Sequence, residues 1–278
     1  MCQLLGMNCN NPAEITFSFE GFSARGGLTD EHKDGWGIAF YNDTGCRLFT
    51  DHLSSISSPL AEMIKRNPIK SCNVIAHIRK ATQGNIILEN NHPFMRELWG
   101  KSWIFAHNGD LKNFHPTLNG LNGIYRPVGE TDSERAFCYL MEGLQQRFPY
   151  ANADDLPPTE ALFDAITELT KYIASHGIFN FMLSNGDALF AHCSTNLHYV
   201  VREYPFSTAA LIDCDKSIDF SKFNKPDDKI AVIATKPLTS DESWCAFHPG
   251  ELKMFLAGHP TKDTLIPTEL YEVAEEIA

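Results

Sequence analysis

Two long helix-forming segments lie in the middle of this 278-residue chain, and the segments on either side of them are patterned as strands. The first helix begins at residues 131–134 (TDSE), which have the spacing of a capping box. The second covers residues 159–175, where apolar side chains recur on one helical face. Strands, then helices, then strands predict an α+β domain with two sheets and helices packed outside them.

Short apolar runs mark the predicted strands. An Asn185-Gly186 pair between two apolar runs predicts a β-hairpin. A shorter helix is expected from Ser58-Pro59 to about Arg66, with proline in its first turn. No repeat and no low-complexity tract interrupts the chain, so we expect one domain over residues 1–278. The other predicted strands are residues 2–6, 36–41, 46–50, 72–78, 103–107, 197–203, 229–235, 244–247 and 252–258.

Composition excludes several classes of protein. A formal net charge of −12 argues against a nucleic-acid partner, which would require a basic surface. No apolar run approaches the ~20 residues that cross a bilayer. Residues 1–14 lack the basic and apolar regions of a secretory signal, so we expect a cytoplasmic protein. None of the eight cysteines forms a Cys-x-x-Cys pair, which removes support for zinc-ribbon and thioredoxin-like sites.

One cysteine, Cys2, directly follows the initiator Met1. Removal of Met1 before this small side chain would leave a residue with a thiol and an α-amine on one carbon. Their unperturbed pKa values are ~8.5 and ~7.7–8.0, so a nucleophile and a weak base can both titrate near neutrality. Taken alone, a Met-Cys start is equally explained by chance.

Four further segments place polar groups at strand ends or at a helix start. They are residues 34–37 (DGWG), 76–82 (AHIRKAT), 106–110 (AHNGD) and 129–134 (GETDSE). Such positions predict a pocket built at the edge of a sheet.

Each of these segments also has a purely structural interpretation. Asn108-Gly109 can be a tight turn, although residues 110–115 make a poor return strand. Asp132 can simply complement the helix dipole. Arg79 can be a surface charge, Thr131 and Glu134 can be caps, and His77 and His107 can be hydrogen-bonded core histidines.

Taken in order, the motifs resemble a known family. Cys2, then HIRKATQG with NHPF soon after, then AHNG, then ETDSE is similar to the class II (N-terminal-nucleophile) glutamine amidotransferases. Within that family the chain most resembles the stand-alone YafJ-type bacterial proteins, which carry DGWG early. The resemblance spans residues 1 to about 137, and it implies a four-layer αββα Ntn-hydrolase fold.

The resemblance also implies roles for individual residues. The Cys2 thiolate attacks the γ-carboxamide of glutamine with its own α-amine as the base, giving a thioester, ammonia and then glutamate. Neither a cofactor nor a metal is needed. The implied roles are oxyanion stabilisation by Asn108 and Gly109, binding of the substrate α-carboxylate by Arg79, binding of its α-ammonium by Asp132, and a substrate contact by Thr82.

Two positions depart from the family pattern. Many members follow the arginine with Trp and place His after the Thr, where this chain has Lys80 and Gln83. The loop over residues 80–90, which covers bound glutamine in relatives, therefore has a different chemistry here. His92 and His107 are expected to make structural hydrogen bonds.

Other functions stay open on the sequence alone. The chain ends at the length of a glutaminase domain, so either a separate synthase subunit accepts the ammonia or the substrate is another γ-glutamyl amide, such as a glutathione-like or ergothioneine-pathway-like compound. A metallohydrolase is disfavoured because His77, His92 and His107 lack ligand spacing. An inactive amidotransferase-fold binding subunit is the non-enzymatic alternative.

Overall fold

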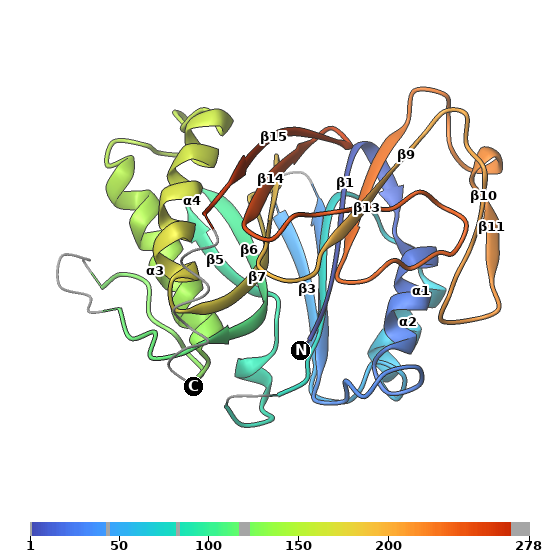
Figure 1. Cartoon of the computed structure of the whole chain (residues 1–278), viewed down its shortest axis with the longest axis horizontal. Helices are drawn as coiled ribbons and strands as arrows, with labels where there is room; N and C mark the ends of the chain where they lie inside the picture. The colour runs from blue at the N-terminus through green and yellow to red at the C-terminus, as the bar shows by residue number, and fades with distance from the viewer. Residues whose placement is uncertain (1, 43–44, 82–83, 117–122, 268–278) are drawn as a thin grey trace.

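Two antiparallel sheets stacked face to face form the centre of the computed structural model, which describes residues 2–42, 45–81, 84–116 and 123–267 (Figure 1). The seven-stranded sheet has the order β13 (Cys245–Ala246), β9 (His198–Glu203), β12 (Lys229–Ala234), β1 (Gln3–Glu14), β4 (Lys70–Ile78), β2 (Trp36–Asn42) and β3 (Gly45–Asp51). The six-stranded sheet has the order β15 (His259–Leu265), β14 (Glu251–Leu256), β8 (Leu189–Cys193), β7 (Gly177–Ser184), β6 (Lys101–Leu111) and β5 (Phe94–Leu98).

Helices cover the outer face of each sheet (Figure 1). On the seven-stranded sheet lie α1 (Thr16–Ala24) and α2 (Pro59–Arg66). On the six-stranded sheet lie α3 (Asp132–Arg147) and α4 (Thr159–Ala174). The expected α+β fold with four layers, αββα, is therefore confirmed. A small ribbon of β10 (Thr208–Ala210) and β11 (Ser217–Asp219), and the 3₁₀ turns η1 (Leu88–Asn90) and η2 (Phe220–Lys222), complete the elements.

The alternation of side chains along the strands explains why the layers stack. In β1, Leu4 packs between the sheets, while Leu5 and Met7 pack against the α1 and α2 side. In β6, Ile104 and Ala106 pack between the sheets, while Phe105 packs against the α3 and α4 side. Because successive side chains point to opposite faces, each central strand contributes to two of the three buried cores.

Most predicted elements are present, with some bounds changed. The hairpin around Asn185-Gly186 joins β7 to β8, as predicted. The strand predicted at residues 2–6 continues to Glu14, because Ala13 and Glu14 pair with β4 again after a register shift. Helix α1 and strand β5 had no predicted counterpart.

The turn expected at Asn108-Gly109 is absent, and the prediction of a turn there is wrong. Both residues lie inside β6, which runs on to Leu111 and pairs with β7 throughout this stretch. At Gly109 an added Cβ would lie 1.8 Å from the carbonyl oxygen of Ile178. Gly109 is therefore required for close packing of two strands rather than for a turn.

Candidate active site

Cys2 lies at the start of β1, beside the end of β4. Since β1 and β4 pair antiparallel with Gln3 opposite Ile78, residue 2 lies next to residues 79 and 80. The Lys80 N–H donates to the half-buried Cys2 Sγ at 3.3 Å, and the thiol lies 3.4 Å from the Lys80 carbonyl oxygen. Cys2 belongs to the same strand face as Leu4, so its side chain lies on the inter-sheet side.

The surroundings of Cys2 affect its ionisation in opposing ways. Burial raises the pKa of the Cys2 thiol, while the Lys80 N–H and the charge of Arg79 act to lower it. Asp34 acts in the same direction as burial. The net pKa lies above the ordinary value, so the thiol is protonated at neutral pH in this state.

Arg79 directly follows the last residue of β4 and is 3% exposed. Its guanidinium donates to two loop carbonyls, from Nη1 to Asn85 at 3.0 Å and from Nη2 to Gly84 at 3.3 Å. Burial lowers the Arg79 pKa, but an arginine stays cationic at any physiological pH. A planar cation thus lies within the same corner as the Cys2 sulfur.

The DGWG segment, residues 34–37, holds the backbone of residues 79–81 through hydrogen bonds. The Arg79 N–H donates to the Gly35 carbonyl at 2.8 Å, and the Asp34 N–H donates to the Arg79 carbonyl at 3.2 Å. The Asp34 carboxylate accepts the Ala81 N–H at 2.8 Å. Gly35 has φ +111°, and a Cβ there would lie 2.5 Å from the Asn91 side chain, so only glycine fits. Sequence reasoning noted this segment but gave Asp34 no role.

Asn108 lies on β6 and, by strand alternation, on the same inter-sheet side as Ala106. Its side chain is 1% exposed, and its Oδ1 is buried without a hydrogen-bond partner among the described residues. The Asn180 amide donates to the Asn108 carbonyl at 2.8 Å and so fixes the backbone at this point. Nothing in the sequence singled out Asn180.

The Gly109 N–H points to the free edge of β6. Hydrogen-bonded and non-hydrogen-bonded pairs alternate in an antiparallel ladder. The Lys112 N–H donates to the His176 carbonyl on the β7 side. Gly109 and Leu111 lie an odd number of residues from Lys112, so their N–H groups point away from β7. Strand β5 covers that other edge only as far as Phe105.

Asp132 occupies the same free edge of β6. Its Oδ2 accepts the Leu111 N–H at 2.7 Å, and its Oδ1 accepts the Ser133 N–H at 2.8 Å. The carboxylate is 5% exposed and lies in the first turn of α3, where the helix dipole favours a negative charge. The Ser133 hydroxyl also lies 3.4 Å from Oδ1, so Oδ2 is the oxygen that keeps a second lone pair for a ligand.

A chain of contacts connects Asp132 back to Arg79. The Asn85 side chain donates to Glu130 at 3.2 Å, and the Glu130 N–H donates to Asn90 at 3.0 Å. Asn85 also provides one of the two carbonyls that hold Arg79. The loop after residue 84 therefore links the start of α3, where Asp132 lies, to the end of β4, where Arg79 and Cys2 meet. Thr82, the remaining predicted substrate contact, lies outside the described residues.

The helix-start residues have more than one role. Thr131 caps α3 by accepting the Glu134 N–H at 3.2 Å, as predicted. Glu134 does more than the expected capping. It is buried, accepts the Val128 and Gly129 N–H groups at 3.0 and 2.7 Å, and pairs with Arg96.

The histidines near the site are buried and neutral. His107 makes the expected hydrogen bonds, to Ser133 Oγ at 2.8 Å and to the Ile178 carbonyl at 3.0 Å. The same expectation for His92 is wrong, because its ring nitrogens have no hydrogen-bond partner among the described residues. The ring packs instead on His77, with centroids 4.3 Å apart, and on Phe94 at 4.4 Å. Burial lowers the pKa of His77 to about 3 and that of His92 well below its ordinary value.

Two kinds of feature are absent from the described part of the chain. No group of three or more His, Cys, Asp or Glu side chains there is arranged to hold a metal ion. No helix there is both long and apolar enough to cross a membrane.

Comparison with known proteins identifies the family. The family model for class-II glutamine amidotransferases matches residues 1–276. A Haemophilus influenzae protein is 52% identical over 265 residues, which cover 95% of this chain and 87% of that protein. Escherichia coli YafJ is 49% identical over 258 residues, which cover 93% of this chain and 98% of YafJ. Both of these relatives carry the name of a glutamine amidotransferase.

Solved structures agree with this grouping. A crystal structure of a predicted glutamine amidotransferase from Pseudomonas aeruginosa has a TM-score of 0.73 and 39% identity, and the match covers 94% of this chain and 100% of that one. The glutamine phosphoribosylpyrophosphate amidotransferase of Bacillus subtilis shares the fold, with a TM-score of 0.59 at 16% identity, over 96% of this chain and 49% of that one. With a family match along nearly its whole length and two relatives about half identical, the chain belongs to the class-II glutamine amidotransferases.

Proposed function

We propose that the protein is a γ-glutamyl amide hydrolase with glutamine as its substrate, and that Cys2 is the nucleophile once Met1 is removed. The observation that carries the proposal is the position of the Cys2 sulfur. The sulfur accepts a hydrogen bond from the Lys80 N–H and lies next to the residue that carries the buried guanidinium, Arg79. A nucleophile beside a carboxylate-binding cation suits a substrate whose reacting amide and α-carboxylate belong to one small molecule.

In the first step, the free α-amine of Cys2 takes the thiol proton, directly or through one water, and the sulfur bonds to the amide carbon. The carbonyl π electrons move onto oxygen, giving a tetrahedral oxyanion. We assign the Asn108 side-chain amide and the Gly109 N–H as the donors to this oxyanion. The direction of the Gly109 N–H, away from β7 at an edge that β5 leaves uncovered, supports this assignment.

In the second step, the C–N bond breaks and the α-ammonium returns its proton to the leaving nitrogen, which departs as ammonia. Water then attacks the thioester on Cys2, and the same two donors stabilise the second oxyanion. Breakage of the C–S bond releases glutamate and regenerates the thiol. These steps need no metal and no cofactor.

In this proposal, Arg79 and Asp132 bind the α-carboxylate and the α-ammonium of the substrate. We assign the α-carboxylate to the Arg79 fork, where it would join or replace the Gly84 and Asn85 carbonyls. We assign the α-ammonium to the second lone pair of Asp132 Oδ2. Thr82 is proposed as an additional contact.

In this proposal Arg79 and Asp132 contact only the α-carboxylate and the α-ammonium of the glutamyl group, so they do not select the leaving group. A screen of glutamine against glutathione and other γ-glutamyl amides, with ammonia or amine release measured, identifies the leaving group. If only glutamine is turned over, a separate synthase subunit is the proposed acceptor of the ammonia. If no γ-glutamyl amide is turned over by protein that lacks Met1, the inactive binding subunit replaces the enzyme.

A labelling experiment tests the nucleophile directly. The glutamine analogue 6-diazo-5-oxo-norleucine should add once to the protein, and peptide mapping should place the adduct on Cys2. Intact-mass spectrometry of the same sample should show that Met1 is absent. Cys245→Ala, which removes an exposed cysteine, is the matched control and should label normally. Active protein that retains Met1, or an adduct on another cysteine, would contradict the mechanism.

A further inference from the structure

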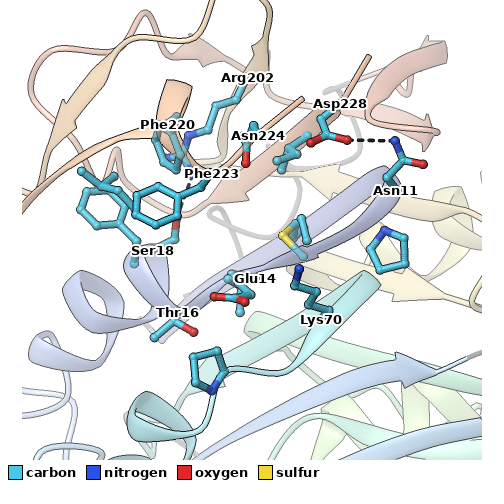
Figure 2. A pocket seen from close by; sticks show the side chains of 18 of the residues that line it. Asn11, Glu14, Thr16, Ser18, Lys70, Arg202, Phe220, Phe223, Asn224 and Asp228 are labelled. Carbon is cyan, nitrogen blue, oxygen red and sulfur yellow. Dashed lines mark hydrogen bonds between the residues drawn. The ribbon is translucent and has the colours of Figure 1, made fainter. Parts of the chain in front are cut away.

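A cavity lies at the other end of β1 from Cys2. It has a volume of about 910 Å³ and is lined by the last residues of β1, the start of α1, and the segment after β11 (Figure 2). Cys2, Arg79, Asn108 and Asp132 do not contribute to its lining. Its size lies within the range typical of small-molecule sites.

Aromatic rings form one wall of this cavity (Figure 2). Phe220 meets Phe17 edge-on at 5.6 Å, and the Arg202 guanidinium lies 4.4 Å above the Phe220 ring. Phe223 at the rim is 71% exposed and has no ring partner among the described residues. An exposed aromatic face beside a cavity is a stacking surface for an apolar or aromatic group.

Two charged side chains on the opposite side of the cavity form no ion pair with any of the described residues. Glu14 and Lys70 are directly opposite each other on β1 and β4, and both line the cavity, yet no ion pair joins them. Figure 2 shows both side chains on the side of the cavity across from Phe223. On the side of Phe223, the Asn224 Nδ2 lines the cavity and is buried without a hydrogen-bond partner among the described residues (Figure 2).

The charges of the lining disfavour an anion. Of the three other lining cations, Arg202 pairs with Glu242 at 2.7 Å and Lys216 pairs with Glu20 at 2.6 Å, which leaves Lys225. The lining also holds the acidic side chains Asp215, Asp227 and Asp228 in addition to Glu14, although Asp228 already accepts hydrogen bonds from Asn11 and the Lys225 N–H. A molecule with one positive and one negative group matches this lining better than a phosphate.

We propose that this cavity binds a free α-amino acid with a large apolar or aromatic side chain. The ligand ammonium pairs with Glu14, and its carboxylate pairs with Lys70. The ligand side chain lies against Phe223 and the apolar floor, which includes Ile15. The site is separate from the γ-glutamyl site, so it does not depend on the proposed function.

Titration calorimetry with L-phenylalanine and L-tryptophan tests the proposal. One saturable site is expected for at least one of them. Analogues that lack one charge, 3-phenylpropionate and 2-phenylethylamine, should bind about tenfold weaker or more, because each loses one charge-assisted contact. Absence of binding by both amino acids up to ~10 mM, or equal binding of the analogues, would overturn the proposal.

Variants then locate the site. Phe223→Ala and Glu14→Gln change exposed side chains and should weaken binding about tenfold with an unchanged melting temperature. Tyr150→Ala, at a 91% exposed tyrosine outside the cavity, is the matched control and should bind normally. Binding that survives both cavity variants, or that is lost in Arg79→Lys, assigns the amino acid elsewhere and refutes the site. Glutamine turnover in the same variants reports separately on the γ-glutamyl site.

Discussion

The sulfur of Cys2 lies 3.3 Å from the backbone nitrogen of Lys80, which donates a hydrogen bond to it. This contact follows from strand pairing, because the start of β1 runs antiparallel to the end of β4. It holds the thiol next to Arg79 before any substrate is present. Positioning of this kind lowers the entropic part of a reaction barrier. The family membership of the chain and this local geometry together make specific substitutions informative.

Replacement of Asn108 by Ala should lower kcat for glutamine roughly 10²–10³-fold with little change in KM, because an oxyanion donor acts mainly in the transition state. The buried side chain makes no hydrogen bond through Oδ1 among the described residues, so truncation should not unfold the protein. Steady-state kinetics of purified, folded variant measure the effect. Asn196→Ala, at an exposed asparagine, serves as the control. A change confined to KM would refute the oxyanion role.

Arg79→Lys should raise KM for glutamine about 10–100-fold, because lysine keeps the charge but loses the planar fork that binds a carboxylate in two places. The Gly84 and Asn85 carbonyls would also lose one of their donors. Initial-rate kinetics separate KM from kcat. The exposed Arg66→Lys is the matched control, and its kinetics should equal those of the unmodified protein. Unchanged KM in Arg79→Lys would remove Arg79 from substrate binding.

Gly109→Ala should destabilise the fold by about 3 kcal/mol, since the new methyl group overlaps a neighbouring strand. The Cβ would lie 1.8 Å from the Ile178 carbonyl oxygen, a backbone atom that cannot move away alone. Urea unfolding measures the difference in free energy. Gly45→Ala is the control, because its nearest neighbour is a carbonyl oxygen at 3.8 Å. Equal stability of the two variants would show that β6 and β7 are not packed this closely.

Acid should weaken the fold through the buried histidines. Burial lowers the pKa of His77 from 6.5 to about 3, so below pH 6.5 the unfolded chain takes up a proton that the folded chain does not. The contribution of His77 to the free energy of unfolding is therefore constant well above pH 6.5. This free energy falls towards pH 3 by up to about 1.4 kcal/mol per pH unit for each such histidine. His92 contributes in the same direction.

Urea unfolding between pH 7 and pH 5 checks this expectation. His77→Phe keeps a ring against His92 and removes one titrating group, so the dependence on pH should become shallower by about one proton. His52→Phe, at a histidine whose side chain is 64% exposed, should keep the original slope. An equal slope in His77→Phe and the unmodified protein would show that His77 is not a buried neutral group.

Local patterns were sufficient for much of the fold. The Thr131 cap, the apolar face of α4 and the Asn185-Gly186 hairpin depend on residues close together in the chain, and each was predicted. Helix α1 was not predicted. Its N-cap residue, Ile15, makes no side-chain cap, and its buried face includes serines and a glycine, so neither a start signal nor an apolar stripe is present.

The candidate site divides in the same way. The motifs around Cys2, Arg79, Asn108 and Asp132 could be found in the sequence, because the chemistry of each residue type is independent of its surroundings. The sequence alone therefore determined the family resemblance, most of the order of elements and the candidate site residues. Only the tertiary structure decided that Asn108-Gly109 continue a strand, that Asp34 and Asn85 hold the Arg79 corner, and that His92 packs without a hydrogen bond. These features depend on contacts between strands and loops far apart in the chain, which local propensity and periodicity do not encode.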